Sequence, residues 1–480
     1  MKTKLTESIS NNSEIVKCYR KTKMRYVALA MACLVMIGSY MCYDFPSYLK
    51  SQVNKSLNLT EFQYSLLYAV YSFPNIALPL FGGIFIDIVG VRKGIFIFTF
   101  ILIIGQLLCS IGVLHSVNNF SVILVGRVIF GLGGESLSVT QSAIVSQWFK
   151  GKEISLALGL NISIARLGSV IGSFLFPALY NINKDLFSPL LVGAIFCVFS
   201  WLCGCVLNFL DKKADQQEGK QQVKISDQDR IKLSDFKELN IQFWLLCISC
   251  VFTYMCFFPF MQFVQGQISD QFGLSSDKAS NLMSLPYLIA AGCTPFAGLL
   301  VDKVGKRGLL LIITSVLMIT SHLTMLIMPQ CGNGDPNCQQ YTFLFPLVLF
   351  GIFYSFYAAV LWPCIPLVVP EKIVGTAFGI TNSLQNGGLA LGPIIVGLII
   401  DHTKHKMNEY FWMEIFFIIF GGLCLIINIT IYWIDIKGNK VLDLAFKETT
   451  EDDEQIEEYK KNSQAVNPRR SLAAKRSFRG

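Results

Sequence analysis

Long apolar runs alternate with short polar, charged segments along almost the whole chain. The hydrocarbon core of a bilayer is about 30 Å thick, so a helix that crosses it needs about 20 mostly apolar residues. Runs of this length predict an all-α polytopic membrane protein with twelve transmembrane helices. The predicted spans are residues 25–46, 63–86, 94–115, 120–147, 154–179, 187–210, 240–263, 279–301, 308–329, 342–368, 374–400 and 410–435.

A polar stretch separates the first six predicted spans from the last six. The first apolar run begins at Arg25, too late and too long for a cleaved signal peptide, so it predicts a permanent span. The C-terminal tail is acidic and then basic, with the low apolar content typical of a disordered segment. The expected divisions are an N-terminal tail (1–24), a six-helix bundle (25–210), a central loop (211–239), a second six-helix bundle (240–435) and a C-terminal tail (436–480).

The distribution of charge predicts the orientation of these spans. Only 15% of the residues are charged, against about 25% in soluble proteins, and the net charge of +8 comes from loops and tails. We therefore read no nucleic-acid partner from it. The tail through Arg25 holds seven Lys and Arg residues and the central loop holds seven more, which predicts that both termini are cytosolic. Glycosylation sequons then fall on the opposite side of the membrane, at Asn54, Asn58 and Asn119.

Most of the fifteen cysteines lie inside apolar runs and indicate packing. Cys331 and Cys338 instead share a polar loop, where they could form a local disulfide in an oxidising lumen. We find no metal-ligand cluster and expect no metal, no cofactor and no enzymatic activity. The four histidines stand at span ends or singly, at His115, His322, His402 and His405.

A short motif occurs twice, each time after the second span of a half. Residues 83–93 read GIFIDIVGVRK, and residues 298–308 read GLLVDKVGKRG. The glycines permit a tight turn and close helix approach, and the charges can pair at a cytosolic end that must open again. We expect these loops to act as gates. The motif residues are Gly83, Asp87, Gly90 and Arg92 in the first copy, and Gly298, Asp302, Gly305, Lys306 and Arg307 in the second.

The fifth spans of the two halves also correspond, at residues 157–172 and 377–392. Repeated six-span halves are typical of rocking-type secondary transporters. The paired Gly-Asp-Gly-basic loops, together with Gly126-Arg127 in the fourth span, resemble two motifs of the major facilitator superfamily. The resemblance covers about residues 25–435 and implies two pseudo-symmetric six-helix bundles.

Three ionisable groups lie well within predicted spans: Arg127, Glu135 and Arg166. A charge at the bilayer centre costs at least about 2.5–3.5 kcal/mol, so each should face a wet cavity or a partner. A rise of about 1.5 Å per residue places Glu135 and Arg166 at one depth, with Arg127 two turns from Glu135 toward the lumen. An acid and a base at one level suit a zwitterion. Two residues of extended peptide span at most about 7 Å, so a dipeptide could place one end on each.

Other interpretations of these charges stay open. Glu135 and Arg166 could simply neutralise each other and lock two helices. Arg127 could serve packing, gating or substrate contact. Asn386 stands where the repeat would place a second Arg166, so the charged anchors occur in the N-terminal half only. Further candidates for the wall of the site come from the seventh, tenth and eleventh spans: Tyr254, Trp362, Asn382, Gln385 and Asn386.

Several runs carry a closer resemblance, to a family of lysosomal dipeptide transporters. They are residues 38–46, 66–75, 126–139, 146–169, 359–371 and 375–392. The resemblance implies that Glu135 binds the amino terminus of a dipeptide and Arg166 its carboxyl terminus. It implies a uniporter that exports dipeptides, favouring those with cationic residues, from lysosome to cytosol. It also implies a glycosylated single-span lysosomal accessory protein, although residues 6–21 show no acidic dileucine sorting signal of the family type.

The sequence leaves two alternatives to dipeptide uniport open. One is a proton-coupled carrier of peptides, amino acids or organic anions, with Glu135 as the proton site. The other is a non-transporting scaffold or sensor on the same fold, which would not need the intramembrane charges or the gate loops. A homodimer is also open on the sequence alone.

Overall fold

The computed structural model describes residues 19–79, 90–149, 153–218, 239–329, 331, 340–370, 373–403, 410–438 and 440–443. These ranges are almost entirely helical and contain no strand. Eleven helices within them are long and apolar enough to cross a membrane. The second predicted span is described only in its first part, as α5 (Glu61–Ser72) and the 3-10 helix η2 (Pro74–Ile76). The predicted all-α membrane fold is confirmed.

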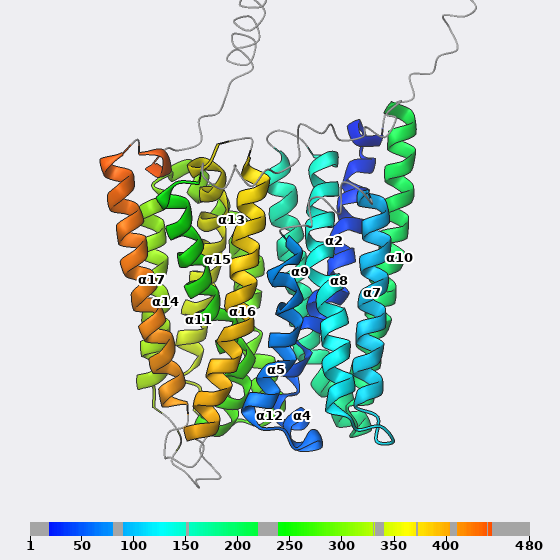
Figure 1. The fold of residues 1–480 in the computed structure, drawn as a ribbon. Coiled ribbons are helices and arrows are strands. Elements are labelled where there is room, and N and C mark those ends of the chain that lie inside the picture. Colours follow the sequence, from blue (N-terminus) through cyan, green and yellow to red (C-terminus); the bar gives the residue numbers. More distant parts are fainter. Residues whose placement is uncertain are drawn as a thin grey trace, which may run out of the picture.

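The helices form two bundles that stand side by side (Figure 1). The N-terminal bundle contains η1 (Tyr19–Lys21), α2 (Met24–Tyr43), α3 (Phe45–Tyr48), α4 (Lys50–Leu57), α5, η2, α7 (Val91–Gly112), α8 (Phe120–Trp148), α9 (Glu153–Asn183) and α10 (Phe187–Glu218). The C-terminal bundle contains α11 (Ile241–Phe272), α12 (Ser276–Met283), α13 (Leu285–Val304), α14 (Arg307–Ile327), α15 (Leu344–Val368), α16 (Val374–Thr403), α17 (Phe411–Lys437) and η6 (Val441–Asp443).

Several helices extend past the apolar runs that predict them. α10 continues to Glu218, beyond the predicted end at residue 210, and α11 continues to Phe272, beyond residue 263. Hydropathy marks the part of a helix inside the hydrocarbon, whereas backbone hydrogen bonds continue into the polar layer. Side-chain caps mark some of the true ends, as where Asn240 accepts a hydrogen bond from the Phe243 amide at the start of α11, at 2.9 Å.

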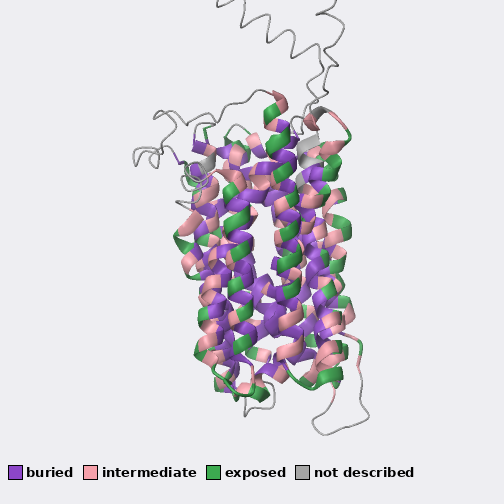
Figure 2. Ribbon diagram, turned by 90° about the vertical axis from the view of Figure 1, so that its right-hand side faces the viewer, coloured by how far each residue is buried: buried purple, intermediate pink, exposed green. Residues whose placement is uncertain are grey.

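Exposed residues lie on the outer faces of the helices, and buried residues gather inside (Figure 2). Many of the exposed residues are large and apolar. Phe296 is 73% exposed, Leu299 67% and Ile426 62%. A soluble monomer rarely exposes such a continuous apolar surface. These faces are suited to lipid.

The two bundles contact each other in a reciprocal pattern. α5 packs against α16, and α9 packs against α13. Each contact therefore joins the second spanning region of one half to the fifth of the other. This pairing is what pseudo-symmetric halves require, and it puts α9, which carries Arg166, at the interface between them.

The chain enters the bundles at the end where α2 begins and α17 ends (Figure 1). We call this end of the molecule the entry end, in the sense of chain entry, and the opposite end, where α4 and α12 lie, the far end.

Candidate substrate-binding site

Arg166 lies on α9 and extends into an aromatic cage between the bundles. The residue is 6% exposed. Four rings surround its guanidinium, with their centroids 5.0 to 5.5 Å from Cζ. One ring belongs to the N-terminal bundle and three to the C-terminal bundle. They are Tyr40 of α2, Phe258 of α11, Tyr287 of α13 and Tyr354 of α15.

The guanidinium keeps hydrogen-bonding capacity despite its burial. Its Nη2 donates to the Tyr354 hydroxyl. Its Nε is buried and has no hydrogen-bond partner among the described residues. Among the residues that the structure describes, Arg166 forms no ion pair. A planar guanidinium with donors to spare can bind a carboxylate through two parallel hydrogen bonds. The geometry of Arg166 therefore fits a carboxylate ligand.

Glu135 lies on α8 and is half-buried. It interacts electrostatically with Arg166 and lies near Tyr71. Across the described residues, however, no Lys or Arg nitrogen lies within 4.0 Å of its carboxylate. The helix lock in which Glu135 and Arg166 pair directly therefore lacks its defining contact in this structure. The two opposite charges are near each other but are not joined.

Arg127 is fully buried and bound to the backbone of its own bundle. Its Nε donates to the Leu67 carbonyl at 2.7 Å, and its Nη1 donates to the Cys42 carbonyl at 3.2 Å. These carbonyls belong to α5 and α2, so Arg127 links three helices. Aromatic rings surround its guanidinium on several sides: Tyr43, Phe45, Tyr68, Tyr71 and Phe130. This geometry favours the packing interpretation over substrate contact.

Tyr254 and Trp362 continue the aromatic wall that begins at Arg166. Tyr254 stacks on Phe258, with 5.3 Å between ring centroids and 21° between planes. Trp362 Nε1 donates to the Tyr254 hydroxyl at 3.2 Å. The structure thus brings these two predicted residues together, one ring removed from the guanidinium.

The three amides of α16 do not extend the hydrogen bonding of the charged pair within the described residues. Asn386 Nδ2 donates to the carbonyl of Asn382 at 3.0 Å, within its own helix. Among the described residues, no hydrogen bond joins Asn382, Gln385 or Asn386 to Glu135 or Arg166. The side-chain oxygens of Gln385 and Asn386 are buried and without a partner in the described part of the chain. They are therefore available as acceptors.

Both repeated loops contain a glycine with positive φ, +85° at Gly90 and +64° at Gly305. Such angles strain any residue with a Cβ, which explains why glycine occurs at the same place in each copy. In the second copy, Arg307 Nη2 lies 3.3 Å from Asp302 Oδ1. The backbone of Lys306 donates to the Asp443 carbonyl at 3.3 Å, and a Cβ at Gly298 would meet nothing within 4 Å. Gly83 and Asp87 of the first copy lie outside the described residues.

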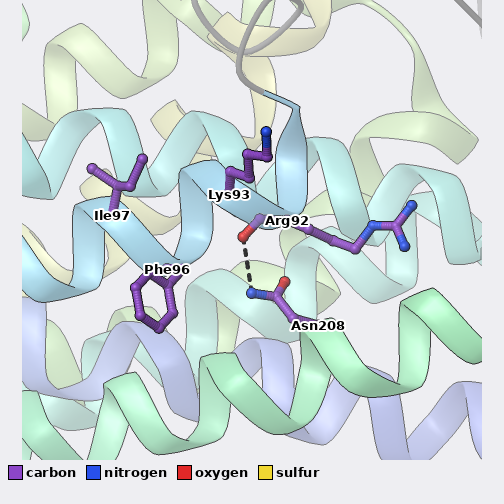
Figure 3. A pocket seen from close by; sticks show the side chains of 5 residues that line it. All are labelled: Arg92, Lys93, Phe96, Ile97 and Asn208. Atoms are coloured by element: carbon purple, nitrogen blue, oxygen red, sulfur yellow. Dashed lines mark hydrogen bonds between the residues drawn. The ribbon is translucent and has the colours of Figure 1, made fainter. Parts of the chain in front are cut away.

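Arg92 of the first copy joins a larger charge network at the entry end. Its guanidinium bonds Asp215 and lies 3.4 Å from Asp211. Arg20 of η1 lies 2.8 Å from Asp211 and 2.7 Å from Asp215. Burial alone would lower the pKa of Arg20, but its hydrogen bonds and charge interactions with these aspartates raise it above its ordinary value. Figure 3 shows the shallow pocket beside Arg92, where its carbonyl accepts from Asn208 Nδ2 at 2.8 Å.

The far end carries the contacts that close the two bundles against each other. Asp401 of α16 accepts hydrogen bonds from the backbone amides of Glu61 and Phe62, at 2.9 and 2.8 Å. It therefore caps the start of α5, where unpaired amides favour a negative charge. Lys50 pairs with Glu61 of its own bundle at 2.9 Å, and its Nζ lies 5.0 Å from the ring centroid of Phe263 in the other bundle. A Cβ at Gly397 would lie 2.6 Å from the Glu61 carbonyl, so only glycine allows this approach.

Further hydrogen bonds between the bundles occur at the same end. Tyr64 donates to the Gln262 carbonyl at 2.8 Å, and Ser280 donates to the Ser173 carbonyl at 3.0 Å. At the entry end, the Arg92–Asp215 and Arg307–Asp302 ion pairs each join residues of one bundle. Among the described residues, the hydrogen bonds named here that join the two bundles therefore gather at the far end.

Asp44, His322 and Glu414 are buried ionisable residues that the sequence prediction missed. Asp44 is 2% exposed, at the break between α2 and α3. His322 and Glu414 are also buried, with Nδ1 and Oε2 2.8 Å apart across α14 and α17. The expectation that only Arg127, Glu135 and Arg166 lie well inside was therefore wrong, as was the expectation that His322 stands singly. Asp44 could have been found from Pro46, because a proline near the end of a span predicts a helix break beside it. The His322–Glu414 pair depends on tertiary packing and has no such local signal.

The predicted modification sites lie at the far end. Asn58 and Asn119 are exposed, whereas Asn54 is partly buried and donates to Glu61 Oε1 at 3.0 Å. Cys331 is disulfide-bonded, and its predicted partner Cys338 lies outside the described residues.

Two pseudo-symmetric helical bundles with buried charges at their interface are typical of a secondary transporter built from repeats. The family model described as Major Facilitator Superfamily matches residues 28–267 and 244–478. The chain belongs to this superfamily.

The similar proteins include a lysosomal dipeptide transporter. The lysosomal dipeptide transporter MFSD1 of Homo sapiens is 36% identical over 421 residues, covering 86% of both chains. The Bos taurus protein of the same name is 37% identical with the same coverage. A hexuronate transporter of Bacillus subtilis is 22% identical, covering 79% of this chain and 87% of its own. The solved nucleoside transporter NupG has a TM-score of 0.65 at 13% identity, covers 84% of this chain and 99% of its own, and supports the fold alone.

Proposed function

We propose that the protein is a dipeptide uniporter that carries dipeptides, favouring those with a cationic side chain, from the lysosomal lumen to the cytosol. The observation that carries the proposal is Arg166, held in an aromatic cage between the bundles with a spare donor, beside a Glu135 that has no ion-pair partner among the described residues. The similarity to lysosomal dipeptide transporters over 86% of the chain supports the same substrate and membrane.

Each charged group takes one end of the substrate. Arg166 binds the carboxyl terminus through its guanidinium, and Glu135 binds the amino terminus. Tyr254 and Trp362 provide an apolar wall for the side chains, and the amide oxygens of α16 provide acceptors. Arg127 braces the N-terminal bundle rather than touching the substrate.

Transport proceeds by alternating access between the two bundles. The entry end is cytosolic, because the basic segments flank it, and the far end is luminal. The closed luminal contacts at Asp401 and Lys50 describe a state open toward the cytosol. Breaking these contacts and closing the Gly-Asp-Gly-basic loops gives the opposite state. We propose two partners to look for. One is a glycosylated single-span accessory protein on the luminal surface, and the other is a second copy of the chain in the membrane.

A second candidate is a proton-coupled carrier of the same or related solutes. The half-buried Glu135, without an ion-pair partner in the described part of the chain, favours it because such a carboxyl could take up and release a proton during the cycle. A pH gradient imposed across proteoliposomes distinguishes the two. Uniport does not need the gradient, whereas a symporter accumulates solute against its own gradient only when protons flow.

Uptake into proteoliposomes tests the substrate class. Labelled Ala-Ala is the transported solute, and unlabelled dipeptides, free amino acids, tripeptides and sugars are the competitors. We expect dipeptides alone to compete strongly. Competition by free amino acids or sugars, with none by dipeptides, would overturn the proposed substrate.

A further inference from the structure

Asp44 is a buried carboxylate beside the proposed site that the two-ended clamp does not use. It stands between α2 and α3, where the first spanning helix breaks. Oδ2 accepts a hydrogen bond from Ser169 at 2.8 Å, and Oδ1 lies 3.5 Å from the Tyr287 hydroxyl. Among the described residues, no Lys, Arg or His nitrogen lies within 4.0 Å of it. Its charge is hydrogen-bonded but not neutralised.

Both partners of Asp44 are neighbours of Arg166. Ser169 follows Arg166 by three residues on α9, so the two side chains lie on one face of the helix. The Tyr287 ring packs against the Arg166 guanidinium, with its centroid 5.4 Å from Cζ. Asp44 and Arg166 also interact electrostatically. Asp44 therefore lies beside Arg166 at the interface between the bundles, one helical turn nearer the far end.

Two more polar groups near Asp44 have no partner. Tyr48 and Tyr68 are fully buried, and neither hydroxyl has a hydrogen-bond partner within the described residues. Both tyrosines interact electrostatically with Asp44. A buried hydroxyl without a partner is destabilising, so a polar ligand that completed its hydrogen bonds would be stabilised there. A carboxylate surrounded by hydroxyls is suited to a cation.

Asp44 is placed to bind a cationic side chain directly. Arg127 is bound to backbone carbonyls of its own bundle, and like Arg166 it interacts electrostatically with Asp44 but lies beyond ion-pair distance of it. A dipeptide with neutral side chains leaves Asp44 in this state. A dipeptide with one cationic side chain gives the carboxylate a hydrogen-bonded partner of opposite charge. Because a buried carboxylate without such a partner is costly, the second substrate is favoured.

We propose that Asp44 receives the cationic side chain of the dipeptide, an ammonium, guanidinium or imidazolium, and so sets the preference for cationic dipeptides. The proposal rests on the proposed function, since it presupposes that Glu135 and Arg166 hold the two backbone ends. Closure of the far end brings Tyr287 of the C-terminal bundle onto Asp44, so the side chain is enclosed when the bundles meet.

The test is a specificity ratio in proteoliposomes. kcat/KM is measured for Lys-Ala and for Ala-Ala with the wild-type protein and with Asp44→Asn. We expect the Lys-Ala to Ala-Ala ratio to fall about tenfold or more, because a charge-assisted hydrogen bond is lost with one substrate only. Asp44→Glu keeps the charge and should retain most of the ratio. Asp44→Ser, which keeps a small polar side chain without the charge, is measured in parallel in case Asn does not fold.

A ratio unchanged in Asp44→Asn and Asp44→Ser, whatever happens to the separate rates, would overturn the proposal and leave Asp44 with a structural, proton or inorganic-cation role. Repeating the ratio with and without sodium and at two pH values identifies which of those roles applies. Failure of the wild-type protein to transport either dipeptide would instead overturn the proposed function, so the two failures are distinguishable.

Discussion

The Arg166 guanidinium of the N-terminal bundle donates a hydrogen bond to the Tyr354 hydroxyl of the C-terminal bundle. This bond crosses the interface at the depth of the proposed site. A substrate carboxylate that binds Arg166 therefore binds a group already shared by both halves. We therefore expect ligand binding and the relative position of the bundles to be coupled through this one side chain.

Removing the guanidinium should remove transport. We expect Arg166→Ala to lower kcat/KM for Ala-Ala by about a hundredfold or more, since a buried charge-assisted interaction is lost. Arg166→Lys should recover little of it, because an ammonium cannot form the planar pair of hydrogen bonds. Tyr354→Phe keeps the ring and should cost about tenfold. Near wild-type uptake by Arg166→Ala, in protein of normal monodispersity, would contradict the proposed role.

Arg127 should matter for stability more than for substrate affinity. Arg127→Ala leaves the carbonyls of Leu67 and Cys42 without their donor, at a cost of about 2–5 kcal/mol. We expect the melting temperature in detergent to fall by at least about 5 °C. Arg127→Lys, which keeps one donor, serves as the matched control. An unchanged melting temperature together with lost substrate binding would show that Arg127 contacts substrate instead.

Asp401 should hold the far end closed. Asp401→Ala removes the acceptor of the Glu61 and Phe62 amides, so these amides should exchange hydrogen faster. Hydrogen exchange followed by mass spectrometry on a peptide covering residues 59–66 measures this directly. Asp302→Ala, at the entry end of the same bundle, is the control and should leave that peptide unchanged. Equal exchange in all three proteins would show that Asp401 does not stabilise closure.

The sequence was sufficient for the fold because its signals are local. Apolar length located the spans, and the paired glycine turns located the second and third spans of each half. Glu135 and Arg166 were recognisable because a charge inside an apolar run is expensive and therefore informative. Asp44 was missed because it stands close to the end of a predicted span, where a carboxylate can reach the polar layer and is not expected to be costly.

The walls of the site could not be predicted in the same way. Aromatic residues make up 13% of the chain, so nothing local distinguishes Phe258 or Tyr287 from a lipid-facing ring. Their place around Arg166 follows from the packing of α9 against α13, a contact between residues far apart in sequence. The same reason explains why the partner of His322 was missed.

The most direct measurement of the two-ended clamp pairs blocked substrates with matched variants. The inhibition constants of Ala-Ala, N-acetyl-Ala-Ala and Ala-Ala-amide are compared in wild-type protein, Glu135→Gln and Arg166→Ala. We predict that N-acetylation weakens binding to the wild-type protein at least about tenfold but weakens binding to Glu135→Gln no further, because the partner is already absent. Amidation should behave in the same way with Arg166→Ala. If each block weakened binding equally in all three proteins, Glu135 and Arg166 would not be the groups that hold the two ends of the dipeptide.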